Sequence, residues 1–199
     1  MSFTGSFTTD DEVFTQSFTL AVESEVSART FSFGGGVNGN GDTIPAGGFP
    51  PILSLFLGTG TQDVLQVATG SSNDCNSLGA GATDPTDGFC WDAFFTTVLP
   101  AGAYVVALSQ DGNPPNGPGL PDGFFETGNP NYTGVDYVSD PSKTFILVTG
   151  EQRTGNWAFD LSVTPLQSAP EPGTLALLAL GLAGLVHTRR GRRGSMLDA

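Results

Sequence analysis

The chain has 199 residues and is acidic, with 20 Asp and Glu against 7 Lys and Arg and a formal net charge of −13. Four of the basic residues lie close to the end, so residues 1–168 carry 18 acidic residues against three basic ones. This excess argues against a nucleic-acid partner, because Lys and Arg contacts to phosphates supply most of that affinity. It is typical of a solvated extracellular surface, and 28 Gly and 14 Pro predict many turns between short strands.

The first part of the chain predicts five strands. Alternating apolar and polar residues predict a half-buried strand, and a short apolar run between turn residues predicts a buried one. On these grounds we expect strands at 3–8, 13–22, 26–33, 52–57 and 62–68. Because the run at 52–57 is apolar on both faces, it is expected in the centre of a sheet, with 62–68 as its hairpin partner.

Further strands are expected in the second half. Aromatic and β-branched residues flank the turn Pro100-Ala101-Gly102 and predict a hairpin of 91–99 with 103–109. Two more strands, at 143–149 and 156–164, are expected to close the domain.

Eight or nine short strands, long Gly- and Pro-rich loops and almost no helix signals predict an all-β fold. We expect an antiparallel jelly-roll-like β-sandwich followed by a C-terminal apolar helix. The sandwich is assigned to 1–164 and an extended linker to 165–169. This length suits one domain and suffices to bury a sizeable core. In the polar stretch 111–142, only 124–125 and 132–138 are expected to contribute short pieces.

Two cysteines, Cys75 and Cys90, predict one disulfide. An even pair in an exported chain is typically oxidised, and the bridge would close a loop of about 15 residues worth about 3 kcal/mol. The alternative is a pair of reduced core thiols.

Carboxylates crowd the same Gly- and Asn-rich loop, and hard cations prefer such oxygen ligands. We therefore consider a calcium site there, with calcium as the one candidate cofactor and a second acidic cluster at 10–12. The alternative is that these residues form solvated acidic turns, since Asp and Asn are ordinary turn formers. The candidate ligands are Asp74, Asp84, Asp87 and Asp92, and the second cluster is Asp10, Asp11 and Glu12.

No catalytic motif is recognisable, and we expect that the protein is not an enzyme. The single histidine, His187, lies in the C-terminal region, which leaves the body without a histidine for a nucleophilic triad or a metal site. Glycoside hydrolysis by two carboxylates stays open in principle, but no spacing singles out a pair.

Aromatic side chains could form a carbohydrate-binding face if they are exposed, although such residues more often pack in cores and at sheet edges. Trp157 alternates with apolar partners and is assigned to the core. The residues considered are Trp91, Trp157, Tyr104, Tyr132 and Tyr137.

The C-terminal region has three parts in a fixed order. A rigid, extended Pro-Glu-Pro peptide comes first, then an unbroken apolar run at 175–186, then a basic cluster. Twelve helical residues span about 18 Å, so crossing a hydrocarbon core of about 30 Å needs the flanking residues and snorkelling arginines. Because short basic loops stay cytoplasmic, residues 1–168 are expected across the membrane. The residues at the two ends of the region are Pro170, Glu171, Pro172, Arg189, Arg190, Arg192 and Arg193.

This arrangement at 170–193 closely resembles the PEP-CTERM sorting signal of Gram-negative bacteria, and only the short tail 194–199 departs from it. The resemblance implies transient anchoring in the inner membrane and cleavage near Pro-Glu-Pro by an exosortase, an integral-membrane protease. It further implies a final place at the cell surface or in an extracellular matrix, often with exopolysaccharide and biofilm. The alternatives are a permanent membrane anchor and an ordinary buried C-terminal helix.

The body also resembles the sandwich domain often found ahead of PEP-CTERM signals and, more distantly, the bacterial pre-peptidase C-terminal domain. The similarity rests on strand-and-turn patterns at 5–13, 18–20, 52–56, 99–106 and 150–161. It implies a sandwich fold and brings no catalytic residues.

Residues 1–20 show neither a basic n-region nor a continuous apolar h-region of a secretory signal. We expect the numbering to begin near the mature N-terminus, or the start to have been placed too late. Taken together, these patterns predict a non-enzymatic, exported surface or matrix protein. A calcium-dependent or carbohydrate-binding module is the alternative.

Overall fold

The computed structural model describes residues 1–58, 64–69 and 82–166, with backbone alone for 64–69. Met1–Pro165 form one compact unit, and the second unit, Leu166–Ala199, falls almost wholly outside the described residues. The predicted C-terminal helix therefore lies outside them as well. Within the described ranges, no helix has the length and apolar character needed to cross a bilayer.

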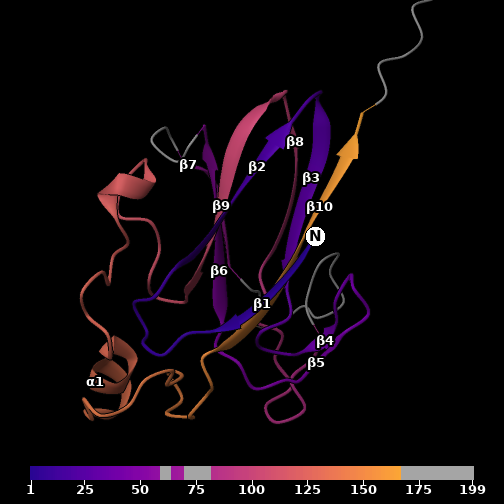
Figure 1. Cartoon of the computed structure of the whole chain (residues 1–199). Coiled ribbons are helices and arrows are strands. Elements are labelled where there is room, and N and C mark those ends of the chain that lie inside the picture. Colours follow the sequence, from indigo (N-terminus) through magenta and orange to yellow (C-terminus); the bar gives the residue numbers. More distant parts are fainter. Residues whose placement is uncertain (59–63, 70–81, 167–199) are drawn as a thin grey trace, which may run out of the picture. The chain divides into compact units, whose positions relative to one another are not determined.

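Met1–Pro165 fold as two antiparallel four-stranded sheets packed face to face (Figure 1). The first sheet has the order β1-β10-β3-β8 and the second β2-β9-β6-β7. A further two-stranded ribbon pairs β4 with β5. The strands are β1 Ser2–Ser6, β2 Phe14–Leu20, β3 Ser24–Thr30, β4 Gly36–Val37, β5 Thr43–Ile44, β6 Pro51–Leu57, β7 Val64–Thr69, β8 Phe94–Leu99, β9 Gly102–Gln110 and β10 Asn156–Pro165.

The strand order is that of a jelly roll, in which successive strands cross between two sheets in Greek-key fashion. The predicted all-β sandwich is thus confirmed. β6 lies inside the second sheet, and its residues alternate between two apolar environments, as its doubly apolar sequence predicts. Leu53 and Leu55 face the core between the sheets, whereas Phe56 packs with Phe124 and Leu120 on the outer face.

The predicted hairpin of 91–99 with 103–109 is wrong. β8 pairs with β3 in the first sheet and β9 with β2 and β6 in the second, so the turn at 100–102 crosses between sheets. The hydroxyl of Tyr104 donates to the Pro100 carbonyl at 2.9 Å and braces this crossing. The edge strand β8, buried on one face, is thus followed by the central strand β9, buried on both faces. The residue pattern does not distinguish such an arch between two sheets from a hairpin within one sheet.

Two further corrections concern the segment between β9 and β10. It contains a 3-10 turn, η1 Leu120–Asp122, and an α-helix, α1 Tyr132–Val138, where no helix was expected. Residues 143–149 form turns instead of the predicted strand, because Phe145 takes a positive φ of 56° and leaves only an isolated bridge from Ile146 to Gln152.

The main core lies between the sheets and is unusually aromatic. Trp157, buried as predicted, contacts Phe14 at a ring-centroid distance of 4.6 Å and Phe7 at 5.7 Å. Gly5 pairs with Trp157 across β1 and β10, and the indole occupies the place where a Cβ of residue 5 would stand. A glycine in this edge strand therefore lets the indole lie flat against the backbone.

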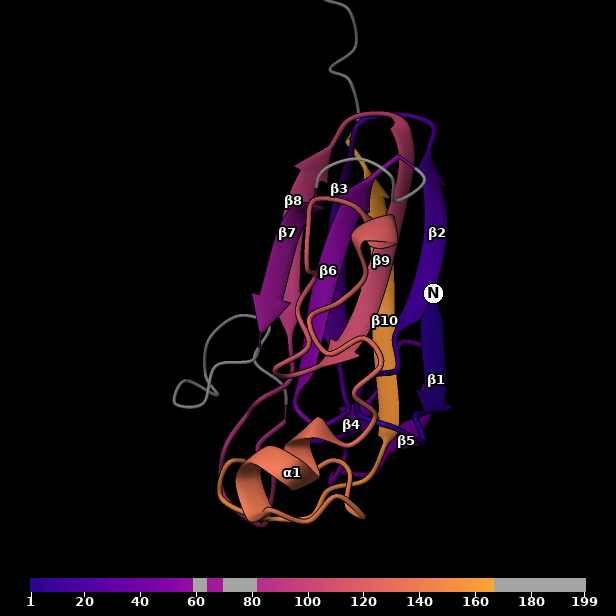
Figure 2. The ribbon, with the colours of Figure 1, turned by 90° about the vertical axis from the view of Figure 1, so that its left-hand side faces the viewer.

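The sandwich has two distinct ends. Pro165 pairs with Ser24, which also pairs with Leu99, so the end of β10 lies beside the turns that follow β2 and β8. β9 begins at this end with Gly102 and runs to Gln110 at the other. Figures 1 and 2 show α1 at that other end, away from the end of β10.

Candidate ligand-binding site

A buried arginine holds together the end of the sandwich where β9 stops. Arg153 is 4% exposed, and its guanidinium contacts the carboxylates of Asp84 at 2.5 Å and Asp87 at 2.9 Å. Its charge also lies 4.2 Å from the ring centroid of Phe33, a cation–π contact. Burial opposes ionisation of Asp84, but the hydrogen bonds and charge of Arg153 hold the pKa of that carboxyl below its usual value.

A second buried carboxylate, Asp92, fixes the chain next to this ion pair. It accepts hydrogen bonds from the hydroxyl of Thr30 and from the backbone amides that follow β3, those of Ser32, Phe33 and Gly34, at 2.6–3.1 Å. Burial nevertheless raises the pKa of Asp92. Arg153 and Asp92 thus tie the segment 82–92, which has no regular secondary structure, to the sandwich.

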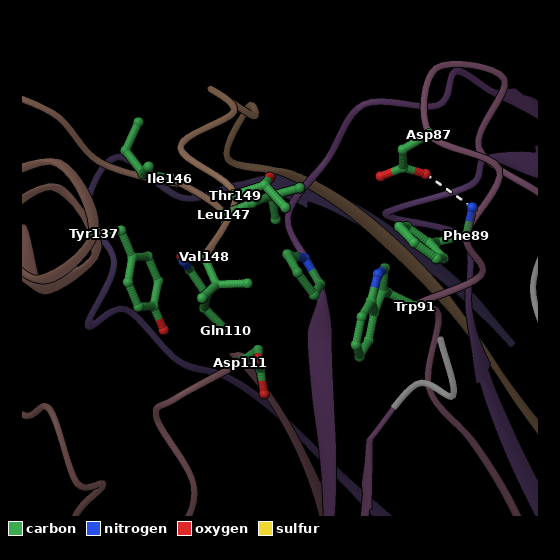
Figure 3. A pocket seen from close by; sticks show the side chains of 11 residues that line it. Asp87, Phe89, Trp91, Gln110, Asp111, Tyr137, Ile146, Leu147, Val148 and Thr149 are labelled. Atoms are coloured by element: carbon green, nitrogen blue, oxygen red, sulfur yellow. Dashed lines mark hydrogen bonds between the residues drawn. The ribbon is translucent and has the colours of Figure 1, made fainter. Parts of the chain in front are cut away.

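The segment held in this way presents an aromatic wall to a pocket (Figure 3). Phe89 and Trp91 lie edge to face with ring centroids 6.3 Å apart, and the Phe89 amide donates to Asp87 at 2.9 Å. Phe89 is 38% exposed. The pocket has a volume of about 90 Å³ and is lined by Pro50, Asp87, Phe89, Trp91, Gln110, Asp111, Tyr137, Ile146, Leu147, Val148 and Thr149.

The end of β9 supplies polar groups to the same pocket. Gln110 is 2% exposed, and among the described residues its Oε1 has no hydrogen-bond partner. Asp111 follows at the surface; its amide donates to the Pro50 carbonyl, and its own carbonyl accepts from the Tyr132 hydroxyl. Surrounding atoms desolvate the Asp111 carboxyl and raise its pKa, although the residue as a whole is exposed.

The opposite wall comes from α1, which Asp10 fixes in place. The buried Asp10 carboxylate accepts from the amide and hydroxyl of Thr133 and from the amide of Phe145, at 2.6–2.9 Å. Desolvation by burial raises the pKa of Asp10 despite these bonds. Tyr137, one turn further along α1, reaches the pocket and is 39% exposed. Figure 3 shows it across the pocket from Trp91.

The candidate calcium ligands have other partners where the structure describes them. Asp84 and Asp87 contact Arg153, and Asp92 is saturated by amides, while Asp74 lies outside the described residues. The second cluster is also divided among separate contacts: Asp11 accepts from the Gly128 amide, and Glu12 from the amides of residues 8 and 9. In the described part of the chain, no three His, Cys, Asp or Glu side chains gather to hold a metal ion.

The aromatic candidates divide between core and pocket. Trp157, Tyr104 and Tyr132 are buried, whereas Trp91 and Tyr137 line the pocket. Sequence reasoning missed Phe89 and Gln110, and it noted Arg153 as one of three basic residues of the body and as part of the resembling stretch 150–161, without a role at a site. A lone basic residue among so many acidic ones was the available signal that it would be paired. Cys90 is fully buried, and since Cys75 lies outside the described residues, the disulfide stays a prediction.

In chemical terms the pocket offers aromatic faces, aliphatic side chains, and hydrogen-bond acceptors and donors. At about 90 Å³ the pocket is smaller than a typical small-molecule site, which suits one projecting group of a larger ligand better than a whole enclosed substrate.

The comparisons with known proteins identify the C-terminal region. No curated protein and no solved structure gives a match to the chain. A family profile, the PEP-CTERM protein-sorting motif, matches residues 168–193. The motif indicates export, anchoring in the membrane, processing by an exosortase, which is a membrane protease, and sorting to the cell surface. The chain thus carries a PEP-CTERM protein-sorting motif at residues 168–193.

Proposed function

We propose that this protein is a non-enzymatic component of the cell surface or extracellular matrix of a Gram-negative bacterium, where it associates with exopolysaccharide. The observation that carries the proposal is the sorting motif at 168–193, which begins within three residues of the end of β10. In this view the sandwich is the exported domain, and the C-terminal region is the sorting signal that exosortase removes.

A binding role suits the chemistry of the sandwich better than a catalytic one. The chain's single histidine lies in the sorting motif, at His187. Of the two carboxylates at the pocket, Asp87 is already engaged by Arg153 and by the Phe89 amide, which disfavours its use as one of a glycosidase pair. Asp111 then has no ready partner acid among the residues that line the pocket.

The direction of the strands supports surface display. The sorting motif follows the end of β10, and the pocket lies at the opposite end of the sandwich, beside the end of β9. The chain therefore leaves the sandwich, toward the sorting motif, at the end that does not carry the pocket.

The proposal is tested in the native host by intact mass and cell fractionation of the wild type and the Glu171→Ala variant. Glu23→Ala, which changes an exposed glutamate in the turn after β2, is the matched control. We expect the wild type and the control to lose the residues beyond the 170–172 peptide and to reach the surface fraction, whereas Glu171→Ala stays full-length in the inner membrane. Full-length, membrane-bound protein in all three strains would overturn the proposal and make the region a permanent anchor.

The association with exopolysaccharide has its own readout. In a host strain deleted for exopolysaccharide synthesis, we expect the processed protein to move from the cell-associated fraction to the medium. An unchanged distribution would remove the polysaccharide partner and leave the sorting proposal standing.

A further inference from the structure

We propose that the pocket formed by Phe89, Trp91, Gln110, Asp111 and Tyr137 binds a pyranose unit of a polysaccharide that carries no acidic groups. The inference deepens the proposed function and rests on it, because it names the site and the ligand class through which the exported domain would hold exopolysaccharide.

The aromatic lining of the pocket suits one face of a sugar ring. Aromatic rings from the 82–92 segment and from α1 face the pocket from two sides (Figure 3). Large aromatic side chains are normally buried, yet Phe89 and Tyr137 keep 38% and 39% of their surface exposed here. Rings with one apolar face and a wet edge suit the C–H face of a pyranose.

The pocket is lined by both acceptors and donors, the carboxylate of Asp111 and the side chains of Gln110, Trp91 and Tyr137 among them, and this mixture suits a ligand rich in hydroxyl groups. The Oε1 of Gln110 is buried without a partner among the described residues, a state that costs free energy. The Asp111 carboxylate accepts a hydrogen bond from the Gly112 amide and is partly desolvated by its surroundings. Sugar hydroxyl groups, and the amino group of a hexosamine, supply such donors on the edge of the ring, next to its apolar face.

Charge selects against acidic polysaccharides. Asp87 and Asp111 both lie at the pocket, no Lys or Arg is among the described residues that line it, and Arg153, which contacts Asp87, also contacts Asp84. The whole chain carries −13. A uronic-acid or sulfated chain would therefore approach a surface of its own sign, and no Lys or Arg of the described residues lines the pocket to bind it.

The segment that carries Phe89 and Trp91 is held rigidly before any ligand arrives. Arg153 contacts the two carboxylates that precede these rings in the sequence. Asp92, which directly follows Trp91, accepts hydrogen bonds from three successive backbone amides after β3. Fixing the rings in advance reduces the ordering that binding would otherwise require. A 90 Å³ pocket that contacts one ring gives weak affinity per site, which many repeating units of a polymer offset by avidity.

The test uses the full chain, purified in a detergent without a sugar headgroup, and titrates it with cellohexaose, chitosan hexamer and oligogalacturonate. Binding is followed by intrinsic fluorescence, because Trp91 is one of only two tryptophans and the other, Trp157, is buried in the core. We expect saturable changes with cellohexaose, chitosan hexamer or both, and none with oligogalacturonate.

Variants separate the pocket from the rest of the surface, with isothermal titration calorimetry as the readout wherever the tryptophan is changed. Trp91→Ala is expected to weaken binding at least tenfold. Gln110→Met is expected to weaken it while leaving Tm equal or higher, because it removes an unpaired buried acceptor. Asp111→Asn should lower affinity, and its charge-matched control Glu23→Gln, at the opposite end of the sandwich, should not. Phe125→Ala, which removes a 67% exposed aromatic outside the pocket, should also bind as the wild type does.

Failure of the folded wild type to bind either non-acidic oligosaccharide overturns the inference, as does wild-type affinity in both Trp91→Ala and Gln110→Met. Preferential binding of oligogalacturonate also overturns it. None of these outcomes contradicts the sorting proposal. That proposal is tested separately, by intact mass and cell fractionation of the Glu171→Ala variant.

Discussion

Arg153 and Asp84 form a buried ion pair of 2.5 Å between residues 69 positions apart in the sequence. Their side chains are 2% and 1% exposed, so the pair joins the segment before β8 to the segment before β10 without access to solvent. Removing one member leaves an uncompensated charge in the interior, which is the more damaging change to a buried pair.

We therefore expect Arg153→Met to lower the free energy of unfolding by about 3–5 kcal/mol. Urea denaturation of the full chain measures this. The control is Lys143→Met, since the Lys143–Asp140 pair is 3.9 Å long and largely exposed, and its loss should change stability by about 0–1 kcal/mol. Equal effects of the two variants would contradict the assignment of Arg153 as the buried anchor.

The Asp84 carboxyl links stability to pH. Burial opposes its ionisation, but the bonds and charge of Arg153 bring its pKa below 3.8 in the folded state. A lowered folded pKa contributes stability that is present above the unfolded value and is lost as the pH falls through the folded one. On acidification from neutral pH to about pH 2, the wild type should therefore lose more stability than Asp84→Asn.

Asp10→Asn provides the opposite control. Burial raises the pKa of Asp10 in the folded protein above its value in the unfolded chain. The protonated carboxyl therefore contributes stability below the unfolded pKa, and this contribution is lost as the pH rises through the folded pKa. Its removal should steepen the loss of stability on acidification. Parallel curves for the wild type and both variants would refute the two assignments.

Gly5→Ala is expected to destabilise the domain by about 1–3 kcal/mol, because the new Cβ would stand inside the indole of Trp157 and force the ring from its place. Thermal unfolding and the near-UV circular dichroism of the buried tryptophan report the change. At Gly41, also mutated to Ala, no atom stands near the new Cβ but φ is +86°, so a loss there reflects backbone strain alone and leaves the tryptophan signal unchanged.

Reduction should destabilise the protein if Cys75 and Cys90 are joined. We expect a reductant to lower Tm, corresponding to about 3 kcal/mol for a loop of this length, and Cys75→Ser to abolish the response. Peptide mapping after alkylation without reduction gives an independent readout. Full alkylation of both thiols in the folded or unfolded protein would disprove the bridge.

Added calcium is expected to leave Tm unchanged. Asp84 and Asp87 are bound by Arg153, and Asp92 already accepts bonds from three amides and a hydroxyl, so a cation would have to displace stronger partners. A rise in Tm that follows calcium concentration and is absent in Asp74→Asn would restore the calcium-dependent alternative.

The sequence was informative wherever one residue pattern corresponded to one environment. The doubly apolar run of β6 predicted a central strand, and the alternation around Trp157 predicted its burial. It failed where two structures share a pattern: the alternating sequence of β8 and the apolar sequence of β9 suit a hairpin as well as an arch between sheets. α1 was missed because its stability comes from Asp10 and from the close approach of residues 140–143 to Gly134, not from local helix propensity.

The pocket could be anticipated only in fragments. Trp91 and Tyr137 were recognised as possible sugar-stacking residues, but they are 46 positions apart and reach one pocket through Asp92 and Asp10, whose tertiary contacts have no local signature. The same acidic residues that suggested calcium instead accept hydrogen bonds from backbone amides and pair with Arg153. A carboxylate in a loop is chemically suited to each of these roles, and only the fold selects among them.

The position of β10 between β1 and β3 determines how the domain bears load. In a protein tethered beyond Pro165 and holding a polymer at the far end, tension acts along β10. Antiparallel hydrogen bonds lie perpendicular to the strand direction. A force along β10 therefore loads its five residue pairs with β1 and its seven with β3 simultaneously, in shear, and does not break them one after another. The strand that leads to the sorting signal is thus also the one best placed to transmit a pulling force from the cell without unravelling.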